Sequence, residues 1–302
     1  MARFGTVVTA MVTPFDERGA LDLDGAVVLA RHLVESGSDG IVVAGTTGEG
    51  PVLADDEKLD LFRAVAQAVT VPVVAATGSN DTAHSVALTR AAADCGIDGV
   101  LVVTPYYNRP SPAGLSAHFR AVAGATDLPV LLYDIPVRSG RRIGPALLVE
   151  LAREVANIVG VKDATGDVAG AARVVAETPS AFEVYSGDDS LTLPFLAVGG
   201  VGVVSVASHW AAAELAELVA RYQAGDVAGA QAVNQRLIES YDFQSSDDYP
   251  NPVPAKAACR AQGLPVGQCR LPHPPAPPEL ARHASEVIAR LTATATARET
   301  VV

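Results

Sequence analysis

The chain has 302 residues, of which 49% are apolar and 19% are charged, so it is long enough for a large globular domain with a sizeable core. Its formal net charge of −12 argues against nucleic acid or an anionic membrane surface as a partner. The start of the chain shows no long apolar segment, and no apolar run approaches the roughly 18 residues of a membrane span. We therefore expect no signal peptide, no membrane span and a cytoplasmic protein.

The three cysteines, Cys95, Cys259 and Cys269, are scattered and show no C-x-x-C spacing. An odd, dispersed count is typical of free thiols in a reducing compartment and not of a disulfide framework. We expect these thiols to be buried and unpaired.

Short β-type runs alternate with Ala- and Leu-rich helical patterns along the first 224 residues. The predicted strands cover 5–12, 40–44, 72–76, 99–103, 129–133, 158–162, 182–186 and 202–206. The helices predicted after them cover 21–36, 54–69, 81–95, 113–126, 145–155, 168–177, 190–198 and 210–224. Asp81 is a suitable N-cap for the third of these helices.

This alternation predicts the fold. The strand runs are continuously apolar, which favours a parallel sheet that is covered on both faces. Strict strand–helix alternation repeated eight times indicates a closed (β/α)8 TIM barrel. The alternative is an open, doubly wound sheet, but no G-x-G-x-x-G loop follows the first strand to support it.

The domain organisation follows from where the alternation stops. Residues 1–224 form the predicted barrel, which carries the active site. Residues 225–291 form a C-terminal helical appendage with helices at 226–241, 256–262 and 278–291, and the low-complexity tail at 292–302 is expected to be disordered.

Lysine is rare in this chain, and one lysine stands out. Lys58 lies in D-D-E-K-L-D, where a solvated salt-bridging helix face is expected, and Lys256 lies in a late Pro-rich region. Lys162 ends a β-type run, which places it at the carboxyl end of a strand. Burial disfavours the ammonium form of a lysine, and a neutral amine can attack a ketone to form a Schiff base. The alternative is a strand-end lysine that extends to solvent.

In a (β/α)8 barrel the loops after the strands carry the chemistry. The loop G-T-T-G-E-G at 45–50 could hold a carboxylate with its backbone N–H groups, or it could be an ordinary Gly-rich turn. After the fourth strand come Tyr106 and Tyr107, which are either packing residues or part of a proton relay. Tyr133 and Arg138 follow the fifth strand, where a phenol can shuttle protons and a guanidinium can bind a carboxylate. The alternatives are a core tyrosine and a surface arginine.

Two further strand ends carry polar residues. S-G-D-D follows the seventh strand, and His209 follows the eighth, where we expect a packed or capping histidine. No pair of histidines with a carboxylate has metal-ligand spacing, so we expect no metal.

As a set, these motifs resemble a known family. G-T-T-G-E, Y-Y-N-R-P, Y-D-I-P-V-R-S-G, G-V-K-D-A-T-G, S-G-D-D, G-V-V-S-V and N-P-V-P-A-K occur in this order between about residues 6 and 270. This pattern is similar to that of the dihydrodipicolinate synthase (4-hydroxy-tetrahydrodipicolinate synthase) family. That family belongs to the pyruvate-dependent class I aldolase superfamily, which includes N-acetylneuraminate lyase.

The resemblance implies an activity and four catalytic residues. Pyruvate would condense with L-aspartate 4-semialdehyde to give 4-hydroxy-tetrahydrodipicolinate for the diaminopimelate and lysine pathway. Lys162 would form the imine with pyruvate, with no other cofactor and no metal. Tyr133 would act as general acid and base, Thr46 would orient it, and Tyr107 would complete the relay from a neighbouring subunit. The family is usually a homotetramer.

The resemblance also implies the substrate-binding residues. Thr47 and the loop amides would hold the pyruvate carboxylate, and Arg138 would bind the carboxylate of the aldehyde. Gly187 and Val204 would line the pyruvate pocket with backbone atoms. Arg138 favours this family over its relatives, since sialic-acid lyases differ at that position.

The chain departs from the family pattern at two positions. Asp134 stands where the family commonly has Asn, which adds a negative charge beside the barrel mouth. His84 stands where lysine-inhibited relatives carry an acidic residue, so we expect poor inhibition by lysine.

Two alternative functions remain: a related aldolase or dehydratase acting on a sugar-derived 2-keto acid, and a barrel that senses a keto acid without turnover.

Overall fold

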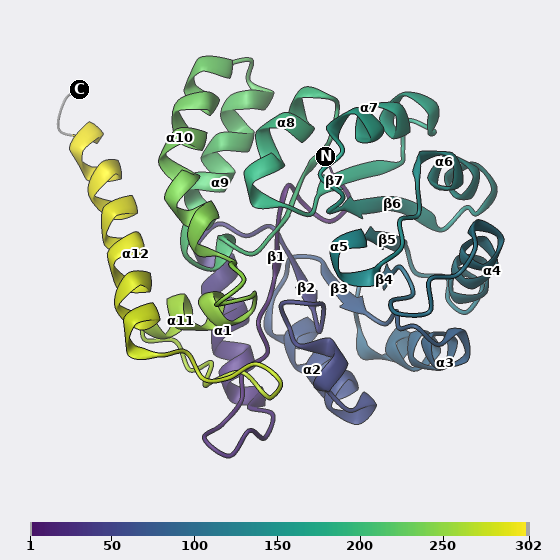
Figure 1. Ribbon diagram of the computed structural model, residues 1–302, viewed down its shortest axis with the longest axis horizontal. Coiled ribbons are helices and arrows are strands. Elements are labelled where there is room, and N and C mark those ends of the chain that lie inside the picture. Colours follow the sequence, from purple (N-terminus) through teal and green to yellow (C-terminus); the bar gives the residue numbers. More distant parts are fainter. Residues whose placement is uncertain (1, 300–302) are drawn as a thin grey trace.

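The computed structural model describes residues 2–299, and over these residues eight parallel strands close into a barrel. The strands pair in chain order and β8 closes onto β1, which confirms the predicted (β/α)8 fold (Figure 1). The strands are β1 (Val7–Ala10), β2 (Gly40–Val43), β3 (Val73–Ala76), β4 (Gly99–Val103), β5 (Val130–Asp134), β6 (Ile158–Asp163), β7 (Glu183–Ser186) and β8 (Gly202–Ser205).

Helices surround the barrel on its outer side (Figure 1). Those of the barrel are α1 (Leu23–Glu35), α2 (Asp55–Ala68), α3 (Thr82–Ala92), α4 (Pro112–Ala123), α5 (Pro136–Ser139), α6 (Pro145–Glu154), α7 (Val168–Glu177), α8 (Thr192–Ala197) and α9 (Ser208–Gln223), with short 3-10 turns η1 (Gly50–Val52), η2 (Ala93–Cys95) and η3 (Asp189–Leu191). Asp81 caps α3 as predicted, since its carboxylate accepts the backbone N–H groups of Ala83 and His84.

The chain beyond the barrel forms a helical layer against it. Its helices are α10 (Val227–Phe243), α11 (Val253–Ala261) and α12 (Pro278–Glu299). α10 packs on α9, and α12 lies at the edge of the molecule against α10 and α11 (Figure 1). None of the helices within residues 2–299 combines the length and the apolar character that a membrane crossing requires.

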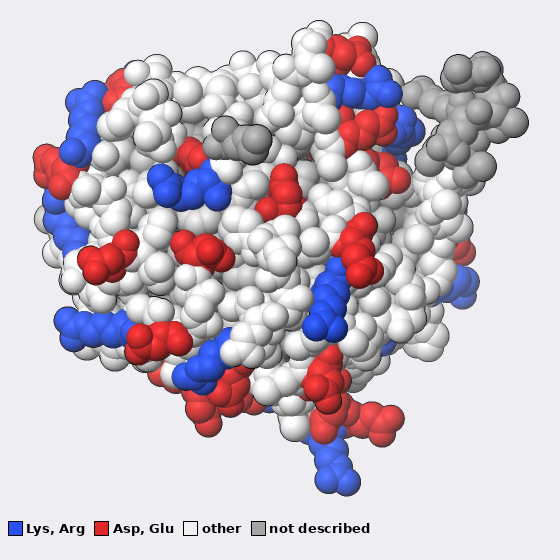
Figure 2. Space-filling model, turned by 180° about the vertical axis from the view of Figure 1, so that it is seen from behind, with Lys and Arg blue, Asp and Glu red and all other residues white. Residues whose placement is uncertain are grey.

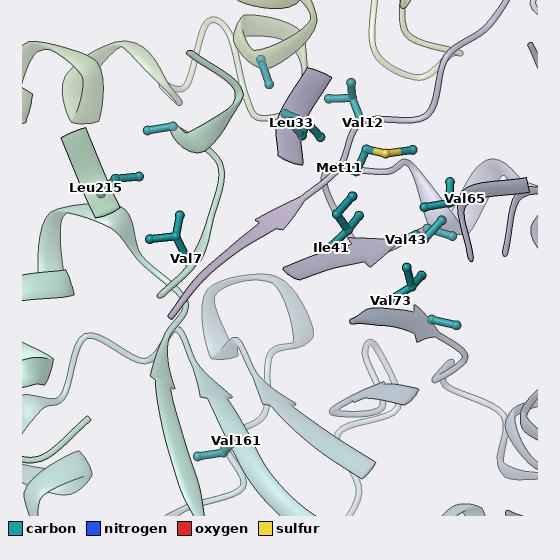
Figure 3. Close-up of a cluster of buried hydrophobic side chains, with 14 of the residues drawn as sticks. Val7, Met11, Val12, Leu33, Ile41, Val43, Val65, Val73, Val161 and Leu215 are labelled. Carbon is teal, nitrogen blue, oxygen red and sulfur yellow. The ribbon is translucent and has the colours of Figure 1, made fainter. Parts of the chain in front are cut away.

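Two apolar layers explain why the strands are hydrophobic on both faces. Alternate strand residues point outward to the helices, and those between them point into the barrel. Val8, Val42 and Val74 belong to the inner cluster. Figure 3 shows part of the outer cluster, in which strand residues meet helix residues. Its labelled members include Val7, Ile41, Val43 and Val73 from the strands, and Leu33, Val65 and Leu215 from α1, α2 and α9.

The register of β5, β6 and β7 determines which way the side chain of the strand-end lysine points. Lys162 is the register partner of Tyr133 on one side and of Tyr185 on the other. Residues in register on neighbouring parallel strands point to the same face of a sheet. Tyr133 and Tyr185 both belong to the inner cluster. Lys162 therefore points into the barrel and not into the helix layer.

Some elements were not predicted from the sequence, and others have different bounds from those predicted. The short helix α5, which carries Arg138, was not predicted, because four residues are too few for a helical period to be visible. The last helix continues to Glu299, beyond the end predicted at residue 291, and so includes part of the tail for which disorder was expected. Residues 300–302 of that tail lie outside the described residues.

A buried ion pair fastens the C-terminal layer to the barrel. Lys256 Nζ on α11 lies 2.8 Å from Glu49 Oε1 in the loop after β2, and both side chains are only 1% exposed. The other oxygen of Glu49 accepts the backbone N–H of Arg270 at 2.8 Å, and Lys256 also donates to the carbonyl of Gln268. Burial lowers the pKa of Lys256, although the Glu49 carboxylate opposes this shift. The ion pair joins the loop after β2 to α11, two segments that are far apart in the sequence.

The charged surface mixes both signs. On the face seen in Figure 2, Lys and Arg side chains lie beside Asp and Glu side chains and do not gather into one basic patch. Exposed ion pairs in the described chain include Arg120 with Glu150 and Glu154, and Arg221 with Glu217. Pairs of this kind contribute little to stability, since solvent screens them.

The buried pair predicts a stability effect that an exposed pair does not. Lys256→Met leaves the Glu49 carboxylate buried without a counter-charge, so we expect the free energy of unfolding to fall by about 3–5 kcal/mol. The matched control is Arg63→Met, which removes the exposed Arg63–Asp60 pair and should cost at most about 1 kcal/mol. Urea unfolding at equal protein concentration measures both, and equal losses would show that the buried pair has no special role.

Candidate active site

The amine of Lys162 lies inside the barrel at the carboxyl end of β6. Its side chain is 4% exposed, and its Nζ lies 4.3 Å from the centre of the Tyr133 ring. Gly187 packs on the lysine stem: a Cβ at this position would lie 3.1 Å from Lys162 Cγ and 2.8 Å from the Cβ of Ala164. A larger residue at Gly187 would therefore displace the lysine.

Tyr133 lies at the end of β5 in the same interior. It is buried, and its carbonyl accepts both the backbone N–H and the hydroxyl of Thr104. Val204 of β8 is buried in the same inner cluster. The structure thus brings four of the predicted site residues into one region: Lys162, Tyr133, Gly187 and Val204. A buried amine beside a phenol provides the groups that imine formation requires, a nucleophile and a proton carrier.

The loop after β2 has a tight backbone that leaves no room for a side chain at Gly48 or Gly50. Ala44 and Glu49 both have positive φ, at 54° and 57°. A Cβ at Gly48 would lie 2.9 Å from Ala44 Cα, and one at Gly50 would lie 2.2 Å from Ala44 O. Thr13 holds the loop by donating its hydroxyl to the carbonyl of Gly48 at 2.6 Å. The glycines of G-T-T-G-E-G thus let the loop fold back on itself.

This loop presents unpaired backbone donors. Within residues 2–299 the N–H groups of Thr46, Thr47 and Gly48 donate no hydrogen bond to the protein, while Glu49 N–H donates to Thr46 O. Consecutive free N–H groups in a turn are suited to binding an anion such as a carboxylate. Thr46 and Tyr133 line the same cavity, yet no hydrogen bond joins their side chains in the described structure.

Thr47 and Arg138 are linked by a residue that the sequence analysis gave no role. Asn251, in the segment between α10 and α11, donates its Nδ2 to Thr47 Oγ1 at 2.9 Å. Its carbonyl accepts Arg138 Nη2 at 3.2 Å. The motif N-P-V-P-A-K was part of the family pattern, but nothing local in it indicates that the asparagine reaches the barrel mouth.

Tyr107 does not reach the cavity of its own chain. It is 90% exposed, its φ is +70°, and its backbone N–H donates to Ser139 O. Tyr106 lines the cavity instead. An exposed phenol on this rim is consistent with a role in a neighbouring subunit, and that role stays a prediction.

A cavity of about 660 Å³ extends from the barrel mouth to α2 and α3. Thr46, Tyr133 and Arg138 line one part of it, and Lys58 and His84 line another. His84 Nε2 lies 2.8 Å from a carboxylate oxygen of Asp55, and Lys58 Nζ lies 3.5 Å from the other. The salt-bridging role expected for Lys58 is confirmed, but its side chain is mostly buried and not solvated. Poor inhibition by lysine stays a prediction.

His209 has the structural role that was expected. It is buried, its Nε2 accepts the backbone N–H of Val12 at 3.1 Å, and its Nδ1 contacts Val206 O at 2.8 Å. Burial lowers its pKa to about 4.

Among the thiols, Cys95 and Cys259 are buried and unpaired as predicted, whereas Cys269 is partly exposed.

Asp134 is buried behind the site and not beside the barrel mouth, which corrects the sequence-based expectation. It follows Tyr133 on β5 and therefore points to the opposite face, where its Oδ2 accepts the N–H of Ile143 at 3.0 Å. Its Oδ1 has no hydrogen-bond partner in the described residues. Burial raises the pKa of Asp134 to about 6, and the carboxylate of Asp163, its register partner on β6, adds to the rise.

Comparison with known proteins gives one consistent result. The model of the dihydrodipicolinate synthetase family matches residues 3–291. The chain is 50% identical over 272 residues to 4-hydroxy-tetrahydrodipicolinate synthase of Moorella thermoacetica, covering 89% of this chain and 92% of the relative. It is 51% identical over 280 residues to the enzyme of the same name from Mycolicibacterium paratuberculosis, covering 92% of each.

Solved structures agree with this result. A dihydrodipicolinate synthase of Bacillus anthracis has a TM-score of 0.92 and 45% identity, covering 96% of this chain and 99% of that one. The enzyme from Cyanidioschyzon merolae, solved with lysine bound, has a TM-score of 0.93 and 41% identity, and the match covers 97% of this chain and 99% of that one.

The buried Asp134 predicts a stabilising substitution. A carboxyl whose pKa rises from 3.8 to about 6 on folding binds more protons in the folded state between these values, so stability falls as pH rises through that window. Asp134→Asn removes this loss. We expect the free energy of unfolding to rise by about 2 kcal/mol at pH 8, and by less at pH 5.

Urea unfolding at the two pH values measures the effect. The exposed change Asp127→Asn is the control and should shift the free energy of unfolding by no more than about 0.5 kcal/mol. A loss of stability in Asp134→Asn at pH 8 would show that the buried charge of Asp134 does not destabilise the folded protein.

Proposed function

The chain belongs to the dihydrodipicolinate synthetase family, and from that premise we propose that Lys162 carries out its reaction through a Schiff base with pyruvate. The protein is a lyase that condenses pyruvate with L-aspartate 4-semialdehyde to 4-hydroxy-tetrahydrodipicolinate, in the diaminopimelate and lysine pathway. The observation that carries the proposed mechanism is the buried amine 4.3 Å from the Tyr133 ring.

The proposed reaction begins with capture of pyruvate. The neutral amine of Lys162 attacks the keto carbon, and the resulting carbinolamine loses water to give the imine. Tyr133 donates a proton to the leaving hydroxyl and later takes one back, with Thr46 orienting its phenol. Loss of a proton from the methyl group converts the imine to an enamine. No metal and no other cofactor takes part.

The second half of the reaction joins the two substrates. The enamine carbon attacks the aldehyde of the semialdehyde, forming the new carbon–carbon bond, and the aldehyde oxygen takes up a proton. The amino group of the condensed adduct then attacks the imine carbon and displaces Lys162. Ring closure thus releases the product and regenerates the free amine.

Carboxylate binding explains the remaining residues of the site. The free N–H groups of the loop after β2, together with the Thr47 hydroxyl, suit the carboxylate of pyruvate. Arg138 lines the cavity outside them. One of its Nη atoms donates to the carbonyl of Asn251, and the remaining N–H groups of its guanidinium are suited to the carboxylate of the aldehyde. Gly187 and Val204 close the pocket around the lysine.

The proposal includes an oligomer in the cytoplasm. Tyr107 and Val137 are large, exposed side chains near the barrel mouth. Their burial against a second copy of the chain would bring Tyr107 into the partner's proton relay. We therefore propose at least a homodimer, and by family resemblance a homotetramer.

The assignment of Arg138 predicts a selective kinetic defect. Arg138→Ala should raise the KM for the aldehyde by about 10- to 100-fold, because a hydrogen-bonded ion contact worth roughly 1.5–3 kcal/mol is lost. Borohydride trapping of the pyruvate adduct should change less than about twofold, since that step does not use the guanidinium. Steady-state kinetics and adduct mass measure the two steps.

The control for this variant is Arg141→Ala, which removes an arginine that follows α5 and does not line the cavity. It should leave both steps unchanged. Equal loss of aldehyde and pyruvate binding in Arg138→Ala would mean that this arginine holds the loop and does not bind the substrate.

A further inference from the structure

Asn251 lies between the two proposed carboxylate sites although it belongs to the C-terminal layer. Its side chain contacts Thr47 and its carbonyl contacts Arg138. It is 8% exposed, and Thr47 is 2% exposed. The contact therefore joins two buried side chains from segments that are 204 residues apart in the chain.

The direction of the hydrogen bond decides what Thr47 can do. A threonine hydroxyl has one proton to donate and two lone pairs to accept with. Because Asn251 Nδ2 donates to Thr47 Oγ1, the hydroxyl proton is not used in this contact. Thr47 Oγ1 makes no other hydrogen bond in the described residues. Its proton is thus left to a ligand, beside the unpaired N–H groups of Thr47 and Gly48.

Neighbouring contacts hold the segment that carries Asn251. Its backbone N–H donates to Ser245 Oγ at 3.3 Å. The Lys256–Glu49 ion pair joins the same two segments a few residues further along each of them. The C-terminal layer is therefore fastened to the loop after β2 at several points, one of which is the Thr47 hydroxyl.

We propose that Asn251 is a positioning residue for the pyruvate carboxylate, acting through Thr47, so that the C-terminal layer is part of the active site. The amide holds the hydroxyl as an acceptor and thereby commits its proton to the carboxylate. This inference rests on the proposed function, in which Thr47 binds pyruvate.

Two substitutions test the direction of the hydrogen bond. Asn251→Ala removes the donor and should raise the KM for pyruvate about tenfold, with a change in kcat of less than about threefold. Asn251→Asp places an acceptor where the amide donated, so Thr47 turns its proton away from the substrate, and the new charge repels the carboxylate. The KM for pyruvate should rise further than in Asn251→Ala.

The matched control is Asp248→Ala, an exposed change in the same segment, which should leave the KM for pyruvate unchanged. The KM for the aldehyde should rise less than that for pyruvate in both Asn251 variants, because the backbone carbonyl that contacts Arg138 remains. Equal increases in the two KM values would show that Asn251 only supports the segment, and would overturn the proposal.

A double-mutant cycle with Thr47→Val separates positioning from folding. If Asn251 acts through the Thr47 hydroxyl, Asn251→Ala should change pyruvate binding less than about twofold in the Thr47→Val background. Binding is measured as the pyruvate dependence of borohydride trapping. Full additivity would refute the proposal. Asn251→Gln, which keeps the amide but displaces it, replaces alanine in the cycle if Asn251→Ala does not fold.

The outcomes also separate this inference from the function on which it rests. If the unmodified protein forms no borohydride-reducible adduct with pyruvate, the proposed Schiff-base function fails. If the unmodified protein forms the adduct and the Asn251 variants keep its pyruvate dependence, only the role of Asn251 fails.

Discussion

The site depends on one packing arrangement, a lysine amine held inside a closed barrel beside a phenol. Parallel register places Lys162 between Tyr133 and Tyr185 on the inner face. Gly187 leaves room for the lysine stem, since a Cβ there would lie 3.1 Å from Lys162 Cγ. The closed barrel leaves Lys162 only 4% exposed and holds its amine beside the phenol of Tyr133, so that a nucleophile and a proton carrier lie together.

The C-terminal layer stabilises this site and also shapes it. The buried Glu49–Lys256 pair and the Asn251–Thr47 contact both end on the loop after β2. That loop has a backbone with positive φ at Ala44 and Glu49 and keeps several N–H groups unpaired. A strained loop persists only where its surroundings hold it, so these contacts would preorganise the proposed carboxylate site.

The sequence predicted what depends on local pattern. Strand–helix alternation predicted the barrel, and the position of Lys162 and Tyr133 at strand ends predicted that they would meet. The contact of Asn251 with Thr47 and the burial of Lys256 could not be predicted, because their partners lie about 200 residues away and only the folded chain brings them together. Asp134 was expected near the mouth, yet the alternation of side chains along β5 turns it to the outer face. The role proposed for Tyr107 requires a second chain.

The small number of lysines makes a direct measurement possible. The protein is incubated with pyruvate, reduced with borohydride, digested and mapped by mass spectrometry, so that Lys58, Lys162 and Lys256 are compared in one sample. We expect a pyruvate-derived adduct on the peptide that contains Lys162 and on neither of the other two. An adduct on Lys58, which lines the cavity, or no adduct on Lys162, would contradict the assignment of the imine to Lys162.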